Sequence, residues 1–251
     1  MSLQQPIIRF SEILKLSSQF PETKRGCLVD TSILFAASYD LDVFNTKALE
    51  LFDYLGELEF SLFSNVNIRT EFIDLHRRVL IPEGLASFYA ERESNLDLNL
   101  KTKLQGIYSK LNEAKNRGGS YKFSEEQIKQ WRSLLSSYGT ETDNGWLRFC
   151  DTYLLGKINP VWDEICSDLE INFLSLREND QPSWISGQIS WENMISIVGK
   201  FGIGSFDAMI INLFLNSNFS ALITADKEIA SVINSIKPKN KFVLVPDDLL
   251  I

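Results

Sequence analysis

The sequence predicts an α/β protein with a parallel β-sheet. Near both ends of the 251-residue chain, short apolar runs alternate with longer segments of helical periodicity, which is the pattern of strand–helix–strand units. The run that begins at Cys27 is apolar up to Asp30, as in a parallel strand that is covered on both faces. From about residue 80 to residue 169 the strand signals disappear and the periodicity is helical. We therefore expect one α/β domain that carries a helical insertion.

The front part of the chain predicts a helix that packs on the core, followed by two strands that alternate with helices. Apolar residues near the start recur at helical spacing. Thr31 or Ser32, and Ser64 or Asn65, stand where a side-chain oxygen can cap the helix after a strand. The expected elements are a helix over 7–20, a strand over 27–30, helices over 33–38 and 46–58, a strand over 60–63 and a helix from 64 or 65 to about 79.

The strand–helix alternation resumes near residue 169. Before that point, breaks around Gly118 and over 139–145 divide the insertion into several helices. The expected elements after it are a strand over 171–176, helices over 191–200 and 205–216, a strand over 221–224, a helix over 227–235 and a strand over 242–245. The expected domains are an N-terminal helix over 1–25, an α/β domain formed by 26–80 and 169–251, and a helical insertion over 81–168.

Composition narrows the class of protein. Three scattered cysteines are too few for a disulfide framework or a CxxC metal site, which predicts a reducing compartment. The single histidine, His76, argues against His-centred catalytic triads and His-rich zinc sites. No apolar stretch approaches the ~18 residues of a membrane span, and the first residues lack the pattern of a signal peptide. We therefore expect a cytoplasmic protein with no membrane partner.

Four acidic residues stand where strands end or helices begin. Asp30 follows one expected strand directly and Asp226 lies two residues beyond another, so both belong at the edge of the sheet where ligands bind in such folds. Glu71 and Asp207 lie on helices, on the side that carries apolar residues and should face the sheet. Unpaired carboxylates there are costly, and their repulsion raises their pKa values unless a cation neutralises them. A divalent metal ion is the simplest such cation.

Three of these acids also have an ordinary interpretation. Asp30 and Asp226 could form turns at strand ends, and Asp207 could be a first-turn acid near a Ser205 cap, stabilised by the helix dipole. Taken one at a time, these interpretations stay open. The occurrence of all four acids in such positions favours a shared site.

In their order along the chain, the acids resemble the motif set of the PIN-domain nucleases. That set is a hydrophobic strand ending in Asp followed by Ser or Thr, a Glu in the helix after the second strand, an Asp that opens a late helix, and Thr-x-Asp after the fourth strand. The corresponding segments here are Leu28-Val29-Asp30-Thr31-Ser32, Arg69-Thr70-Glu71-Phe72, Asp207-Ala208 and Thr224-Ala225-Asp226. The resemblance covers roughly 26–80 and 169–251 and says nothing of the insertion.

The resemblance implies a three-layer α/β/α fold with a central sheet of four or five strands, one or two Mg²⁺ or Mn²⁺ ions, and hydrolysis of phosphodiester bonds, most often in RNA. Asp30 and Asp207 would bind the metal, with Asp226 bound directly or through water. Glu71 would bind metal or orient the attacking water. The accessory residues would be Ser32, Thr224 and Glu228. Compact members of the family are often toxins of toxin–antitoxin pairs, which dimerise and are inhibited by a small protein, so a homodimer and such a partner stay open for this chain.

Residues 101–132 are basic, although the chain as a whole has a formal net charge of −8. The segment holds eight Lys and Arg residues against three Glu residues, and 8 minus 3 gives +5. One interpretation is a solvated helical surface whose aromatic residues turn to a core. The other is an RNA-binding surface, in which the Lys and Arg side chains of the segment contact phosphates and its aromatic side chains stack on nucleobases. The aromatic residues are Tyr108, Tyr121, Phe123 and Trp131, and the candidate substrate-binding residues are Lys110, Lys115, Arg117 and Lys122.

Two other functions stay open. Asp30 followed by Thr31 and Ser32 resembles the start of phosphoaspartyl enzymes such as the haloacid-dehalogenase-like phosphatases, but those need a second Asp at the position of Ser32. The other alternative is a PIN scaffold that binds RNA or protein without catalysis, with structural acids. Metal-dependent turnover would separate an enzyme from such a scaffold.

Overall fold

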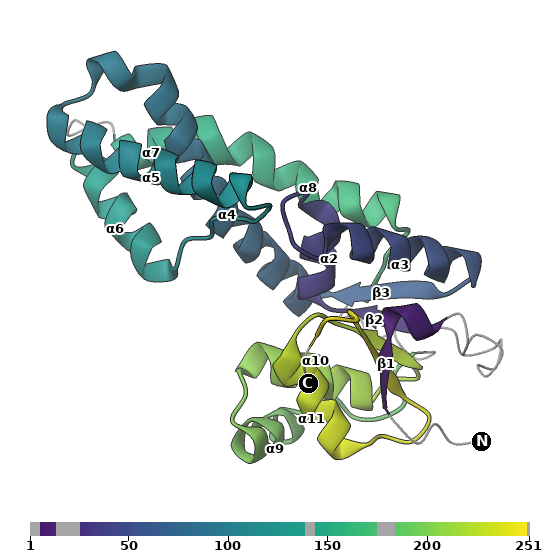
Figure 1. Ribbon diagram of the computed structural model, residues 1–251. Coiled ribbons are helices and arrows are strands. Elements are labelled where there is room, and N and C mark those ends of the chain that lie inside the picture. The colour runs from purple at the N-terminus through teal and green to yellow at the C-terminus, as the bar shows by residue number, and fades with distance from the viewer. Residues whose placement is uncertain (1–5, 14–25, 139–143, 175–183, 250–251) are drawn as a thin grey trace. The chain divides into compact units, whose positions relative to one another are not determined.

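The computed structural model describes residues 6–13, 26–138, 144–174 and 184–249 (Figure 1). The chain divides into two compact units. The first, here called the sheet unit, consists of Met1–Ser38, Phe44–Phe72 and Ile165–Ile251. The second, the helical unit, consists of Tyr39–Val43 and Ile73–Glu164.

The sheet unit is built on a parallel β-sheet, which confirms the predicted α/β class. Its strands are β1 (Ile7–Arg9), β2 (Gly26–Val29), β3 (Ser61–Asn65), β4 (Asn172–Leu174), β5 (Ala221–Ile223) and β6 (Phe242–Val245). The order across the sheet is β1-β6-β5-β2-β3-β4, and every neighbouring pair is parallel. The described sheet therefore has six strands, and the expected four or five is corrected.

The additional strand comes from the segment that was expected to be helical. Ile7–Arg9 form β1 and pair with β6 in the register Ile7↔Val243, and a 3₁₀ turn, η1 (Phe10–Glu12), follows. The helix predicted over 7–20 is therefore wrong for residues 7–9, while residues 14–20 lie outside the described part of the chain. The physical reason is that a three-residue edge strand depends on its pairing with β6, at the other end of the chain.

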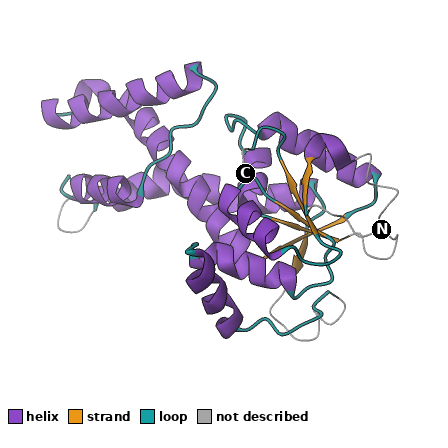
Figure 2. Ribbon diagram, turned by 60° about the horizontal axis from the view of Figure 1, so that its bottom comes forward, coloured by secondary structure: helices purple, strands orange, loops and turns teal. Residues whose placement is uncertain are grey.

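Helices lie on both faces of the sheet. Crossovers between parallel strands are right-handed, so the β2-to-β3 and β5-to-β6 connections, which run in opposite directions across the sheet, leave their helices on opposite faces. Figure 1 shows α2 and α3 on one side of the strands and α10 and α11 on the other, and Figure 2 shows the strands fanned between helices. The helices with residues in this unit are α2 (Thr31–Ser38), α3 (Asn45–Glu57), the start of α4 (Val66–Arg92), the end of α8 (Gly156–Asp168), α9 (Trp191–Phe201), α10 (Ser205–Leu215) and α11 (Lys227–Ile236).

Strands β2, β5 and β6 are buried from end to end. Cys27, Leu28 and Val29 of β2 have no exposed surface. The backbone of β2 also meets an aromatic ring, because a Cβ added at Gly26 would lie 2.6 Å from the Trp184 ring. A side chain at position 26 would therefore push that ring out of the core.

The helical unit has its own apolar core. Its elements are the remainder of α4, η4 (Glu93–Asn95), α5 (Leu98–Asn116), α6 (Glu125–Ser136), α7 (Gly145–Cys150), a π-helical turn η5 (Asp151–Leu155) and the start of α8. The core includes Leu85, Leu104, Ile128, Trp131 and Phe149. No strand occurs in those residues of this unit that the structure describes.

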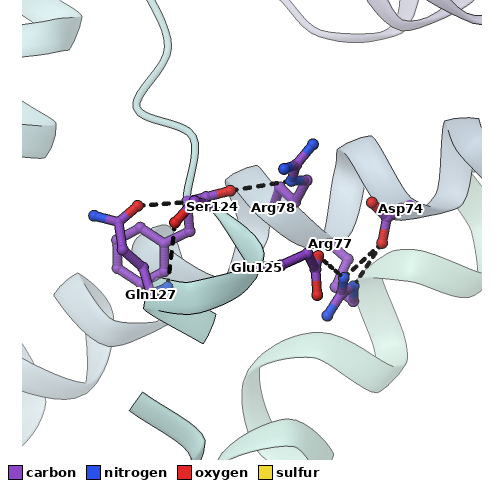
Figure 3. Close-up of polar contacts among 7 residues, drawn as sticks. Asp74, Arg77, Arg78, Ser124, Glu125 and Gln127 are labelled. Carbon is purple, nitrogen blue, oxygen red and sulfur yellow. Dashed lines mark hydrogen bonds and ion pairs between the residues drawn. The ribbon is translucent and has the colours of Figure 1, made fainter. Parts of the chain in front are cut away.

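Polar contacts tie α4 to the segment that leads into α6, as Figure 3 shows. Arg77 pairs with Asp74, at 2.6 Å, and with Glu125. Arg78 donates from Nε to the carbonyl of Phe123 at 3.1 Å and accepts the Phe123 N–H on its own carbonyl at 2.9 Å. A capping box between Ser124 and Gln127 then starts α6.

Helix α4 is longer than expected. The sequence predicts an end near Val79, yet the helix continues to Arg92 with Pro82 inside it, although a proline lacks a backbone donor. Buried apolar side chains on both sides of the proline, Val79 and Leu85 among them, stabilise the longer helix. Among the described residues no single helix has the length and apolar composition of a membrane span, although α9 and α10 taken together do, with a bend of 119° between them.

Lys241 caps the far end of α10. Its ammonium group donates to the carbonyls of Phe214, Ser217 and Phe219 at 2.7, 2.7 and 2.9 Å, and it lies 4.7 Å from the centre of the Phe214 ring. A cation is favoured at the C-terminus of a helix, where carbonyls lack helical partners. One side chain therefore satisfies three carbonyls.

We expect Lys241→Met to lower the free energy of unfolding by about 2–3 kcal/mol, because three partly buried carbonyls lose a charged donor. Urea denaturation of the full chain measures this. The control is Lys239→Met, an exposed lysine two residues earlier, whose effect should stay within about 0.5 kcal/mol. Equal stability of the two variants would contradict the assigned role.

Candidate functional site

The acidic residues gather where the direction of the chain across the sheet reverses. β2 and β5 are neighbours in the register Val29↔Ile223, and the chain leaves them toward opposite edges of the sheet. In such folds a crevice opens at this point, beyond the carboxyl ends of the strands. Asp30 follows β2 directly and donates its backbone N–H to the Ile223 carbonyl at 2.9 Å. Asp226, three residues beyond β5, lies at the same edge.

Asp30 is 3% exposed and is held by two hydroxyl groups. Ser32 and Thr224 donate to the same carboxylate oxygen, Oδ2, at 2.6 and 2.7 Å. Each hydroxyl also accepts a backbone N–H, from Ala225 at 2.9 Å and from Asp226 at 2.8 Å. The hydroxyls therefore connect the end of β2 to the loop after β5. Ser32 and Thr224, both expected as accessory residues, contact Asp30 directly.

Glu71 lies in the second turn of α4 and contacts the residue after Asp30. Its Oε2 accepts a hydrogen bond from the Thr31 hydroxyl at 2.8 Å, and Thr31 is 2% exposed. The expected cap of α4 is present, since Asn65 Oδ1 accepts the N–H of Ile68 at 3.0 Å. Thr31 and Ser32, by contrast, were expected to cap a helix near residue 33. Instead, α2 begins at Thr31 itself and both hydroxyls donate to carboxylates.

The pKa of Asp207 is raised by its burial and by the acids around it. Burial is the largest cause, and the charges of Asp226, Glu71, Asp30 and Glu228 add to it, so that the pKa is raised from its ordinary value of 3.8 to about 7. The capping residue of α10 is Gly204 and not the expected Ser205, whereas Asp207 does lie in the first turn of the helix, as its ordinary interpretation required. A Cβ added at Gly204 would lie 3.0 Å from Asp207 Oδ2. The described structure thus brings Asp30, Glu71, Asp207, Asp226 and Glu228 into one acidic cluster.

Asp226 has a structural role as well. Its Oδ1 accepts the backbone N–H groups of Glu228 at 2.6 Å and Ile229 at 3.1 Å, so it is the N-cap of α11. The turn-forming interpretation therefore holds for Asp226 alongside its place in the cluster. The pKa of Asp30 is raised by burial and by the charge of Asp226, whereas the hydrogen bonds from Ser32 and Thr224 lower it.

The donor set suits a hard divalent cation. All the side chains of the cluster offer carboxylate or hydroxyl oxygens, which are the ligands that Mg²⁺ and Mn²⁺ prefer. No three His, Cys, Asp or Glu side chains in the described ranges form a ready-made metal cage. Mg²⁺ commonly binds through one or two carboxylates together with water and substrate phosphate, so its ligand set does not need such a cage.

The basic segment lies in the helical unit, and its aromatic side chains are largely buried. Phe123 is 1% and Trp131 9% exposed, both in the apolar core, so base stacking by these two residues is ruled out. Tyr121 packs against that core, and Tyr108 is exposed beside Tyr89. For these aromatics the interpretation of a solvated helical surface is the better one.

The basic side chains themselves are exposed. Lys110 and Lys115 lie on α5, and Arg117 follows its last residue. Lys122 is also exposed but lies 3.6 Å from the carboxylate of Asp42. Part of its charge is therefore neutralised within the unit.

Sequence reasoning assigned Thr31 only a helix-capping role and so missed its contact with Glu71. Two hydroxyl residues in succession after a strand-end Asp were the available signal, since one cap needs only one of them. Which carboxylate each hydroxyl would contact depends on where α4 lies against α2. Local sequence does not encode that position.

Without metal, Asp207→Asn should stabilise the protein at pH 8. The folded-state pKa of Asp207, about 7, lies above its ordinary value of 3.8, so proton binding stabilises the folded state. That contribution is complete below about pH 4 and is lost as the pH rises through 7. Allowing for its partial exposure, we expect a gain of about 1–2 kcal/mol at pH 8 that shrinks toward pH 4, measured by urea denaturation in EDTA. Parallel stability curves for the variant and the parent over this range would contradict the clustering.

The cluster thus combines buried, hydrogen-bonded and mutually repelling carboxylates at the reversal point of the sheet. No family model, no curated protein and no solved structure matches this chain. The functional interpretation therefore depends on the residues of the cluster and on the fold that positions them.

Proposed function

We propose that the sheet unit is a PIN-type nuclease that hydrolyses phosphodiester bonds of RNA with a divalent metal ion. One observation carries the proposal: the pKa of Asp207 is raised to about 7 by burial and by four neighbouring carboxylates. Such repulsion weakens a fold unless a cation relieves it, and clustered acids with shifted pKa values are typical of functional sites. The three-layer α/β/α arrangement that the resemblance implies is consistent with helices on both faces of a parallel sheet.

In this proposal Asp30 and Asp207 hold the metal ion, and Asp226 binds it directly or through water. Glu71 binds metal or orients the attacking water. When bound, Mg²⁺ or Mn²⁺ would supply an activated water and charge stabilisation at the leaving oxygen. Glu228 adds negative charge near Asp207, which strengthens the attraction for a cation.

The hydroxyl residues position these carboxylates. Ser32 and Thr224 restrain Asp30 by donating to one of its oxygens, and Thr31 restrains Glu71 in the same way. Partners that orient a ligand in this manner reduce the reorganisation needed when metal and substrate bind. Thr224 also fixes the backbone of Asp226, so one side chain influences two acids.

The contacts of Asp30 and the burial of Asp207 bear on the two alternative functions, a phosphoaspartyl phosphatase and a non-catalytic scaffold. A phosphoaspartyl phosphatase needs a second carboxylate at position 32, whereas Ser32 uses its hydroxyl to hold Asp30. A non-catalytic scaffold has no need for an acid such as Asp207 that is partly buried among like charges, because removing that acid would stabilise the fold. Metal-dependent turnover remains the observation that separates a nuclease from a scaffold.

Asp30→Asn and Asp207→Asn should each reduce Mg²⁺-dependent cleavage of single-stranded RNA by on the order of a hundredfold or more, because each removes a metal-binding charge without changing volume. Cleavage of end-labelled RNA and DNA strands, in Mg²⁺, Mn²⁺ or EDTA, measures this and also tests the choice of nucleic acid. The matched control is Asp53→Asn, an exposed acid on α3, which should cleave like the parent. Undiminished activity of purified Asp30→Asn protein would refute the assignment.

We further propose that the basic surface of α5 attracts the substrate. The acids repel phosphate groups, so attraction at a distance must come from another surface. Lys103, Lys110 and Arg117 are exposed and seven residues apart, which places them along one stripe of the helix, with Lys115 nearby. Such a stripe can follow a phosphate backbone without reading its sequence.

Replacing Lys110, Lys115 and Arg117 together with Glu should weaken the binding of single-stranded RNA and flatten its salt dependence. Three phosphate contacts correspond to a slope of about −2 in log affinity against log salt, at about −0.7 per contact. Fluorescence anisotropy over a range of salt concentrations measures the slope, with Lys239→Glu in the sheet unit as the control. An unchanged slope in the triple variant would leave the segment as an ordinary solvated helical surface.

A further inference from the structure

A pocket of about 570 Å³ opens in the sheet unit. It is formed by the end of β3 and the start of α4, the end of β4, the start of α9 with the segment before it, and one side of α10 from Ser205 to Leu213. Its volume lies within the ~300–1,000 Å³ typical of sites that enclose a small organic group. None of the described residues that line it carries a charge. The pocket therefore suits a neutral group rather than an anion or a cation.

Two exposed aromatic side chains line this pocket. Trp191 is 66% and Phe206 52% exposed, so much of their ring surface is open to solvent. Exposed aromatic surface around a hollow is uncommon unless something covers it. Flat aromatic ligands stack on such rings.

The pocket also offers hydrogen-bonding groups. Asn65 and Asn67 lie in its wall, and Asn65 is fixed because its Oδ1 accepts the N–H of Ile68 at 3.0 Å. Amide side chains can donate to and accept from the edge of a heterocycle. Together with the rings, they match a planar, neutral ligand with polar edges.

The pocket and the acids share the same two helix starts. Phe206 directly precedes Asp207 on α10. Asn67 lies four residues before Glu71 on α4, which places the two on one face and about 6 Å apart along the helix axis. A ligand in the pocket is therefore next to the acids, and a charged extension of that ligand would reach them.

From these observations we infer that the pocket binds an unpaired nucleobase of the strand whose phosphate lies at the acidic cluster. A nucleobase is planar, neutral and polar at its edges, and in a single strand both its faces are free to stack. A base within a duplex is already stacked and paired, so the pocket selects single-stranded segments. The position of the phosphate depends on the proposed nuclease function, whereas base binding by the pocket does not.

The test compares single-stranded RNA with the same strand carrying abasic positions, which keep the sugar–phosphate backbone. Binding is measured with the full chain in EDTA, where no metal-dependent cleavage occurs, by fluorescence anisotropy. The parent should bind the complete strand about tenfold more tightly than the abasic strand, because stacking on an aromatic side chain contributes to affinity for each base. Trp191→Ala should lose this preference and still bind the abasic strand like the parent.

Matched variants separate stacking from general loss of apolar surface. Ile195 is 62% exposed on the same helix as Trp191 and does not line the pocket, so Ile195→Ala should keep the preference. Phe206→Ala should weaken it, whereas Phe173→Ala, at a residue 44% exposed on β4 and outside the pocket lining, should not. Trp191→Phe should retain most of the preference, because a phenyl ring also stacks.

The outcomes distinguish this inference from the proposed function. Base-dependent binding that Trp191→Ala abolishes would support the pocket even if no hydrolysis is found. Metal-dependent hydrolysis with equal affinity for complete and abasic strands would refute base binding by the pocket and would support the proposed nuclease function. Binding of an apolar peptide that complete RNA does not displace would also overturn it.

Discussion

The two hydroxyl contacts to Asp30 are the constraint on which the site depends. Asp30 is 3% exposed, and an unpaired carboxylate at that depth would destabilise the fold by several kcal/mol. Ser32 and Thr224 offset this cost, and each in turn accepts a backbone N–H from the loop after β5. The same hydrogen bonds therefore hold the buried Asp30, join the end of β2 to the loop after β5 and position Asp226. Losing either hydroxyl would loosen all three.

Repulsion among the acids of the cluster lowers the stability of the sheet unit. Asp207 has a pKa near 7 because burial and four like charges oppose its ionisation, even though the N-terminus of a helix favours an anion. Asp226 caps α11 with one of its oxygens, which accepts the backbone N–H groups of Glu228 and Ile229. The cluster thus contains three different kinds of acid. Asp30 is buried and held by hydroxyl groups, Asp207 has a pKa of about 7, and Asp226 caps a helix. Such differences are usual where a site must bind a cation and remain open to a substrate.

Sequence patterns predicted most of the fold and the acids of the site, but they could not predict what depends on distant pairing. Buried strands such as β2 and β6 are continuous apolar runs, and Asp207 and Glu71 stand out because their helical neighbours are apolar. The edge strand β1 has no such signal, because three residues become a strand only by pairing with β6. The passage of α4 through Pro82 and the burial of Trp131 likewise depend on the core of the helical unit. The pocket brings together residues 65, 191 and 206, which only the sheet topology makes neighbours.

In the proposed function, the uncharged pocket and the acidic cluster would contact different parts of one nucleic acid strand. The acids repel a phosphate until a cation is present, so they cannot supply affinity alone. The described residues that line the pocket carry no charge, so the proposed base binding would not depend on whether metal is bound. Both use residues near the starts of α4 and α10, so a movement of either helix start would alter the pocket and the acidic cluster together. In the proposed function, binding of the base and binding of the metal are therefore coupled through these two helix starts.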